Sequence, residues 1–230
     1  MKRNLPGAKA IVVHADAQAL AAAAAQRIAE LAAQAITARG VFHLALAGGE
    51  TPRRCYEQLR VMPVDWRHVR IYFGDERCLP SGDAQRNDTM AREALLNHIV
   101  IPPENVHAIA AELGASGAAA EYAARLPSRL DLVLLGMGED GHTASLFPGN
   151  PATESGENAV PVFGAPKPPP ERVSLGMAVL NGAREKLFLV AGAGKCGALQ
   201  RIARGEALPA ARITGAEWHM DRAAWPQELI

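Results

Sequence analysis

DLVLLGMGEDGHTASLFPG, residues 131–149, joins a short apolar run to a glycine-rich turn that carries an acid and a histidine. The run 132–135 predicts a buried strand, because consecutive apolar residues bounded by glycine suit a strand covered on both faces. The turn beyond it holds Asp140 and His142, with hydroxyl residues close behind. In open α/β folds the turns at the carboxyl ends of parallel strands form the ligand site. We therefore expect a functional site here and not an ordinary surface loop.

A spacing of two places Asp140 and His142 in one site, and histidine is well suited to proton transfer near neutral pH. A histidine alone on a loop is more often incidental, but here an acid, glycines and hydroxyls surround it. A metal site formed by this pair with His219 and Asp221 is the alternative. No H-x-x-x-H pattern or cysteine ligand set supports it, so we expect no metal.

The composition indicates one globular domain spanning 1–230. The chain has 230 residues, of which 49% are hydrophobic, and 24 basic side chains balance 24 acidic ones. A chain of this length buries roughly 70–75% of its unfolded surface and needs no disulfide or metal to fold. A formal net charge of +0 and a pI near 7.1 argue against partners held by bulk charge, so we expect neither nucleic acid nor a membrane surface.

The cysteines indicate a reducing compartment. Cys55, Cys78 and Cys196 lie far apart and form no C-x-x-C pair, which argues against a disulfide framework. The basic start at 1–3 resembles a signal peptide, but polar residues from His14 onward interrupt the apolar run that should follow. No run approaches the ~20 apolar residues of a membrane span. We expect a cytoplasmic protein.

Strands and helices alternate along the chain. Strands are predicted at 10–14, 41–47, 69–73, 106–109, 130–135, 172–180, 186–191 and 218–220. Helices are predicted at 16–39, 52–61, 88–98, in a segment ending at 126, from about 194, and as a final turn after 220. Residues 150–170, rich in proline and glycine, predict a long loop or lid. This order predicts an α/β fold with a mainly parallel sheet covered on both faces.

Three of these strands end in glycine followed by polar residues, and parallel strands bring such loops to one edge. The first loop, 48–52, reads GGETP and opens a helix. The amides of Gly48 and Gly49 and the hydroxyl of Thr51 are therefore candidate anion donors. The Gly-Lys-[Ser/Thr] ending of a P-loop is absent, and a tight turn with a helix cap explains the segment equally well.

Charged residues follow the other strands. The loop after 69–73 carries Asp75 and Arg77, and a guanidinium can grip a phosphate bidentately, although a surface salt bridge is as good an explanation. Arg172 begins a strand after the proline-rich segment, where it either reaches the same pocket or keeps a sheet edge soluble. Lys195 lies in GAGKCG, which fits G-x-G-x-x-G. That motif normally opens a dinucleotide fold, whereas here it comes late, so a small phosphate monoester is favoured.

The segment 136–149, GMGEDGHTASLFPG, resembles the signature of the 6-phosphogluconolactonase family. Supporting segments are AGGETP at 47–52, GDERCLP at 74–80 and RVSL at 172–175, together with 186–195. The resemblance covers nearly the whole chain. One departure is Glu50, where the family more often has a small or hydroxyl residue. A carboxylate beside a phosphate is repulsive unless it points away.

This resemblance implies a three-layer α/β/α sandwich of modified Rossmann type, shared with glucosamine-6-phosphate deaminase. It implies hydrolysis of 6-phospho-D-glucono-1,5-lactone, the second step of the pentose phosphate pathway, by a monomer without metal or cofactor. His142 would be the base and Asp140 its neighbour in the site. The substrate and phosphate ligands would be Asp75, Arg77, Arg172, Lys195 and the loop 48–51.

Three alternatives stay open at this point. Ser145 or Cys78 could form an acyl-enzyme, although a reactive lactone needs no protein nucleophile. A sugar-phosphate isomerase or deaminase could use the same pocket, and release of ammonia from glucosamine 6-phosphate would reveal it. A sugar-phosphate sensor would bind without turnover, but 1–10 is too short for a DNA-binding segment.

Overall fold

The computed structural model describes residues 5–226, and its centre is a six-stranded sheet in which each adjacent pair is parallel. In spatial order the strands are β1 (Ala8–His14), β9 (Ala216–Asp221), β8 (Glu185–Val190), β5 (Leu132–Leu135), β2 (Phe42–Leu46) and β3 (Val69–Phe73). β5 is buried throughout, as its apolar run predicts. The expected mainly parallel α/β sheet is therefore confirmed.

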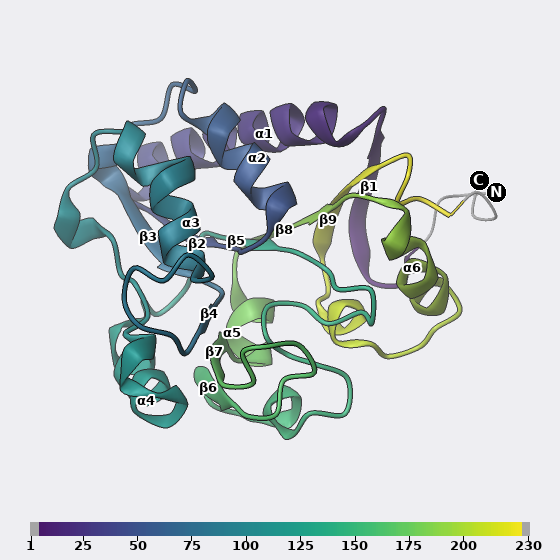
Figure 1. Cartoon of the computed structure of the whole chain (residues 1–230). Coiled ribbons are helices and arrows are strands. Elements are labelled where there is room, and N and C mark those ends of the chain that lie inside the picture. Colours follow the sequence, from purple (N-terminus) through teal and green to yellow (C-terminus); the bar gives the residue numbers. More distant parts are fainter. Residues whose placement is uncertain (1–4, 227–230) are drawn as a thin grey trace.

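Helices pack on the sheet from both sides. They are α1 (Ala17–Arg39), α2 (Glu50–Leu59), α3 (Asn87–Ala94), α4 (Ala115–Arg125), α5 (Met177–Gly182) and α6 (Cys196–Ala203). Figure 1 shows α1 and α2 along one side of the sheet, with α4 and α5 on the other. Short 3-10 turns lie at Trp66–His68, Leu96–His98, Pro103–Asn105, Ala111–Leu113, Pro151–Glu154, Ala193–Lys195 and Pro209–Arg212.

Local signals explain the long helix α1. The side chain of Asp16 accepts a hydrogen bond of 2.8 Å from the backbone N–H of Ala19, which caps the start. Gly40 ends the helix in a left-handed conformation, with φ of 76°, and its N–H bonds the carbonyl of Ile36. The predicted helix at 16–39 is confirmed. No helix in 5–226 is long and apolar enough to cross a membrane.

A second, three-stranded antiparallel sheet was not predicted. It consists of β4 (Asp75–Arg77), β7 (Arg172–Leu175) and β6 (Ala159–Val162), in that order. The prediction of a loop over 150–170 is therefore wrong in part, because β6 lies inside it. The strand predicted at 172–180 ends at Leu175, since α5 begins at Met177. Figure 1 shows this small sheet beside α4 and α5, away from α1.

Other boundaries differ by less. The strand predicted at 106–109 is reduced to one bridge between Val106 and Ile71. The helix predicted at 88–98 is α3 followed by a separate 3-10 turn. The final turn predicted after 220 is present at 222–224, where the N–H of Trp225 donates to the carbonyl of Asp221 at 3.2 Å, and 227–230 lie outside the described residues. The start at 1–3, considered above as a signal-like segment, also lies outside them.

Candidate active site

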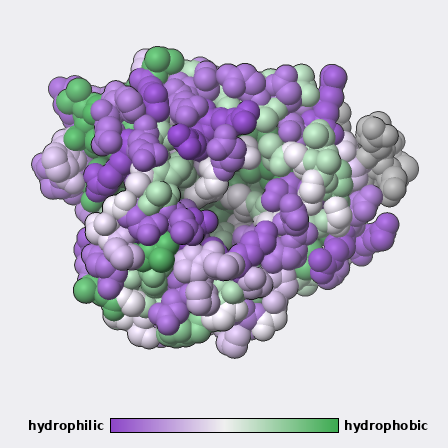
Figure 2. All heavy atoms as spheres, in the orientation of Figure 1, coloured by the Kyte–Doolittle hydropathy of each residue, from purple (hydrophilic) through white to green (hydrophobic). Residues whose placement is uncertain are grey.

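A cavity of about 300 Å³ opens at the carboxyl ends of the central strands. Its apolar and backbone wall includes Ala47, Gly48, Gly49, Gly74, Gly136 and Gly138, from the turns after β2, β3 and β5. Its ionisable side chains are Asp75, Arg77, His142, Lys167, Arg172 and Lys195. The face in Figure 2 is hollowed near its middle, with hydrophilic residues around the hollow. The fold thus brings loops remote in sequence to one place, where α/β proteins bind ligands.

His142 and Asp140 form a hydrogen-bonded pair in the turn after β5. The ring nitrogen Nδ1 lies 2.5 Å from Asp140 Oδ1, and the same oxygen accepts the His142 backbone N–H at 3.1 Å. Burial acts to raise the pKa of Asp140, but these two hydrogen bonds and the nearby ring outweigh it and lower the pKa to about 2. Asp140 is therefore an ionised carboxylate at neutral pH.

An ionised acceptor fixes the tautomer of His142. Asp140 has no proton to give, so Nδ1 carries the hydrogen and donates it. Nε2 is then unprotonated in the neutral ring, and it makes no hydrogen bond to the described part of the chain. His142 lines the cavity, whereas Asp140 does not. The ring is therefore oriented with a free basic nitrogen.

Packing leaves this pair little freedom. A Cβ added at Gly138 would overlap both the His142 ring and the Asp140 carboxylate, so only glycine fits there. The ring of Phe147, 2% exposed, also packs on His142. Glycine in the signature therefore serves the close approach of the two functional side chains.

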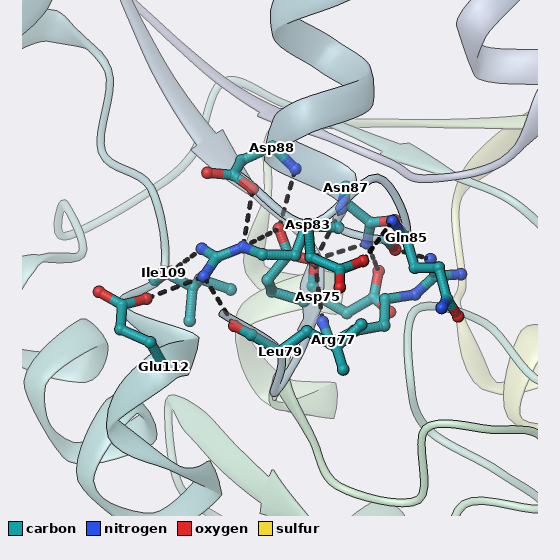
Figure 3. Close-up of polar contacts among 11 residues, drawn as sticks. Asp75, Arg77, Leu79, Asp83, Gln85, Asn87, Asp88, Ile109 and Glu112 are labelled. Atoms are coloured by element: carbon teal, nitrogen blue, oxygen red, sulfur yellow. Dashed lines mark hydrogen bonds and ion pairs between the residues drawn. The ribbon is translucent and has the colours of Figure 1, made fainter. Parts of the chain in front are cut away.

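A buried polar network holds Asp75 at the cavity wall. Ser145 Oγ donates to Asp75 Oδ2 at 2.6 Å, and Asn87 Nδ2 donates to Asp75 O at 2.8 Å and Oδ1 at 3.2 Å. Asn87 also lines the cavity. Figure 3 shows Asn87 directed toward Asp75, beside the start of α3. Asp75 is thus fixed by its neighbours and is not a free surface acid.

Glu76 anchors the helix that carries Asn87. Its carboxylate is fully buried and accepts the backbone N–H groups of Arg77, Asn87 and Asp88 at 2.7–2.8 Å. Burial raises the pKa of Glu76 to about 7, although these donors favour the charged form. Arg86, 2% exposed, donates hydrogen bonds to Asp88 at 2.9 Å and to Glu112 at 2.8 Å. This network ties the start of α3 to β4.

The four cations of the cavity differ in their partners. Arg77 Nη1 donates to the carbonyl of Gln85, while its buried Nε has no partner among the described residues. Arg172 is 5% exposed, and its Nε and Nη2 donate to carbonyls of residues 167–169. The side-chain ammonium groups of Lys167 and Lys195 make no hydrogen bond or ion pair within 5–226. Four cations and one carboxylate line a cavity in a chain of zero net charge, which suits an anionic ligand.

Most of the residues singled out in the sequence lie around this cavity. Gly48, Gly49, Asp75, Arg77, His142, Arg172 and Lys195 line it. Thr51 does not line it, because it lies within the first turn of α2. Glu50 pairs with Arg54 at 3.0 Å on an exposed surface, so its carboxylate does not enter the cavity.

Sequence reasoning missed three residues of the wall. Asn87 stood next to the predicted start of a helix, and only the fold places it at the cavity. Lys167 lies in the segment 150–170, which was predicted to be a loop because it is rich in proline. Phe147 was part of the quoted signature, but nothing in the sequence indicated that its ring packs on His142.

The structure disfavours both candidate nucleophiles. Ser145 is fully buried, and its hydroxyl donates to Asp75. Burial raises the pKa of Cys78 to about 11, which leaves almost no thiolate at neutral pH, and Cys78 does not line the cavity. His219 and Asp221 lie on β9, and no group of three or more metal-ligating side chains occurs within 5–226.

The fold is of the α/β class, and a cationic cavity at the carboxyl edge of a parallel sheet is an arrangement that suits small anionic ligands. A comparison with protein families makes the class specific. The model for glucosamine-6-phosphate isomerases/6-phosphogluconolactonase matches residues 15–225. The chain belongs to this family.

Individual relatives agree with this assignment. The chain is 38% identical over 245 residues to a 6-phosphogluconolactonase of Streptomyces coelicolor, covering 94% of each chain. Its structure is similar to that of a 6-phosphogluconolactonase from Thermotoga maritima, with a TM-score of 0.87, 27% identity, and coverage of 93% and 99%. A monomeric glucosamine-6-phosphate deaminase has a TM-score of 0.80 at 21% identity, covering 94% and 98%. That last likeness shows the shared fold alone.

Proposed function

We propose that this protein hydrolyses 6-phospho-D-glucono-1,5-lactone to 6-phosphogluconate, the second step of the oxidative pentose phosphate pathway. The observation that carries the proposal is the hydrogen-bonded pair of His142 and Asp140 in a cavity that also contains unneutralised cations. The names of the relatives support the same reaction. Three unpaired cysteines agree with a cytoplasmic location.

His142 acts as general base in this proposal. Its free Nε2 takes a proton from water while the water oxygen attacks C1 of the lactone. Asp140 stabilises the imidazolium that forms, as a carboxylate does in hydrolase triads. The tetrahedral intermediate then breaks the bond between C1 and the ring oxygen, and the imidazolium returns the proton to that oxygen. No protein nucleophile takes part.

The oxyanion of the intermediate needs donors, and the glycine turns differ in what they offer. The N–H groups of Gly138 and Gly141 already bond the carbonyls of His142 and Gly138. Those of Gly48 and Gly49 donate to no group within 5–226 and lie at the start of α2. Backbone donors at a helix start are suited to a developing negative charge. We therefore assign the oxyanion to the Gly48 and Gly49 amides.

The substrate phosphate lies among the cavity cations. Arg77 and Lys195 supply positive charge, and Arg172 lies at the same wall with Nη1 as its one uncommitted nitrogen. Burial lowers the pKa of Lys195, because a buried ammonium group loses its hydration, and an anion beside this lysine would compensate for that loss. Holding the phosphate orients C1 toward His142, and such orientation lowers the barrier by several kcal/mol in favourable cases, roughly 7–11 kcal/mol at most.

The test is a coupled assay with freshly generated 6-phosphogluconolactone, corrected for spontaneous hydrolysis. His142→Gln should lower kcat/KM by at least about 10²-fold, the usual contribution of a general base. His68→Gln, at an exposed histidine outside the cavity, should retain wild-type activity. Unchanged activity in His142→Gln would exclude the base, and ammonia release from glucosamine 6-phosphate without lactone hydrolysis would exclude the reaction.

A further inference from the structure

Two lysines stand apart from the other described lysines. Lys9 forms ion pairs with Glu185 and Glu217, and Lys186 donates to the carbonyls of Asn181 and Ala183. The ammonium groups of Lys167 and Lys195, by contrast, have no hydrogen-bond or ion-pair partner in the described chain, and both residues line the cavity. An exposed lysine without a partner is ordinary. Two such lysines that line one cavity, however, create a local positive charge that an anionic ligand can neutralise.

These two ammonium groups act on each other. Burial lowers the pKa of Lys195, and the charge of Lys167 lowers it further, while Glu139 and Asp140 raise it from beyond ion-pair distance. The two cations are therefore close enough to repel. A single anion between them would relieve that repulsion, and a phosphate monoester, with a charge near −2, would relieve it most.

Lys167 is carried by a segment that Arg172 holds in place. We call residues 163–170 the strap. Arg172 Nη2 donates to Lys167 O at 2.9 Å and to Pro168 O at 3.4 Å, and Nε donates to Pro169 O at 3.2 Å. Two of the three nitrogens of this buried guanidinium thus donate to backbone carbonyls of the strap. Arg172 is placed to position this segment.

Further contacts restrict the strap. Asn150 Nδ2 donates to Phe163 O at 2.9 Å, and the N–H of Ala165 donates to the carbonyl of Pro170 at 3.0 Å. The sequence of 167–170 is KPPP, so each proline fixes its own φ and restricts the residue before it. The backbone that carries Lys167 therefore loses little freedom when a ligand binds.

We propose that Lys167 is a phosphate-binding residue that faces Lys195 across the cavity, and that Arg172 positions it through the strap. The proposal rests on the proposed lactonase function, whose substrate carries the phosphate. It gives the strap a role in specificity, because a lactone without phosphate gains nothing from Lys167. Arg172 is then a positioning residue that acts on the ligand through Lys167.

The experiment compares Lys167→Met with wild type on 6-phosphogluconolactone and on unphosphorylated D-glucono-1,5-lactone. The ratio of the two kcat/KM values should fall by about 10–100-fold, the usual worth of a hydrogen bond to a charged group. Most of the fall should come from KM for the phosphorylated lactone, and Lys167→Arg should restore it in large part. Lys9→Met, at a lysine paired with two glutamates outside the cavity, should keep the wild-type ratio.

Arg172→Met should lower the same ratio by loosening the strap. Because it acts through Lys167, the double variant should be little worse than Lys167→Met alone. Full additivity of the two losses would overturn the positioning role. An unchanged ratio in Lys167→Met, or an equal loss on both lactones, would overturn phosphate binding by Lys167.

A binding measurement separates this proposal from the proposed function. Calorimetry with 6-phosphogluconate, and with inorganic phosphate alone, needs no turnover. Weaker binding by Lys167→Met supports the proposal even if wild type hydrolyses no lactone, in which case the proposed function fails alone. Equal affinity of Lys167→Met and wild type for both anions would overturn the proposal whether or not the lactone is hydrolysed.

Discussion

The ring of Phe147 lies against the imidazole of His142, with centroids 4.6 Å apart and planes inclined by 43°. The guanidinium of Arg172 lies over the same ring, with Arg172 Cζ 5.4 Å from the centroid of the Phe147 ring. One buried aromatic side chain therefore contacts both the proposed base and the residue that holds the strap. A cation over an aromatic face is itself attractive, by ~0.5–2 kcal/mol.

Replacing Phe147 by leucine should therefore affect catalysis as well as folding. We expect a loss of about 0.5–3 kcal/mol in the free energy of unfolding. We also expect a lower kcat, because the imidazole of His142 loses the ring that packs against it. Phe188→Leu is the matched control, since Phe188 is fully buried but stacks on Trp218 and does not line the cavity. It should lose similar stability and keep its kcat. Equal kcat values in the two variants would contradict the role of Phe147.

Asp140→Asn should lower kcat/KM strongly. The carboxylate is ionised at neutral pH, since its pKa is about 2, so the variant removes a full charge beside the imidazolium. The variant also leaves the tautomer of His142 unfixed, because an asparagine amide can either donate to or accept from Nδ1. The loss measured for such a change in a serine hydrolase is about 10⁴-fold, and we expect at least about 10²-fold here.

The control for this variant is Asp65→Asn, which removes an exposed carboxylate paired with Arg67 and His68. It should leave kcat/KM unchanged. Lactonase assays at saturating and limiting substrate separate the effect on kcat from that on KM. A loss confined to KM in Asp140→Asn would show that the carboxylate binds substrate and does not support the base.

Gly48→Ala should disturb the cavity through Asn87. A Cβ at Gly48 would overlap the Asn87 carboxamide, which its bonds to Asp75 hold in place. A shift of this kind costs up to roughly 10²-fold in rate. Gly156→Ala, where an added Cβ meets nothing within 4 Å, should be neutral.

The double variant Gly48→Ala/Asn87→Ala tests the cause. Removing the carboxamide relieves the overlap, so the Gly48→Ala loss should be smaller in the Asn87→Ala background than in wild type. The measurement is kcat/KM for the four combinations. Strict additivity would place the effect of Gly48→Ala in the backbone and not in its contact with Asn87.

The parts of the fold that could be predicted depend on local signals. Asp16 and Gly40 cap α1 through contacts within a few residues, and the run 132–135 is apolar enough to read as a buried strand. The convergence of the Asp75 and His142 loops followed from a single rule, the shared direction of parallel strands. Each of these inferences needs no knowledge of distant pairing.

The parts that could not be predicted depend on long-range pairing. β6 is short and includes Pro161, so it shows no clear alternating pattern. A strand beginning at Arg172 was predicted, but nothing in β7 indicated its antiparallel neighbours. Their pairing joins residues such as Val160 and Ser174, which no local signal connects. The position of Lys167 depends on that small sheet and on Arg172. The prolines around Lys167 indicate an irregular segment but not where it lies in the fold.

Acid should destabilise the protein through His219. This ring is 6% exposed, and its Nδ1 lies 3.2 Å from Nε2 of His14. Burial, with a smaller effect of His14, lowers the pKa of His219 to about 4. The folded state therefore binds fewer protons than the unfolded state between that value and the ordinary pKa of about 6.5. Stability is full above about pH 6.5 and falls as the pH drops toward 4, by about 3 kcal/mol from this group.

His219→Gln removes the titrating ring, so its free energy of unfolding should fall less than that of wild type over the same pH interval. Urea denaturation at several pH values between 6.5 and 4 measures the difference in slope. His98→Gln, at an exposed histidine, should keep the wild-type slope. Because other groups titrate in all three proteins, the comparison isolates His219. Parallel curves for wild type and His219→Gln would mean that the ring accepts a proton as readily in the folded state as in the unfolded chain.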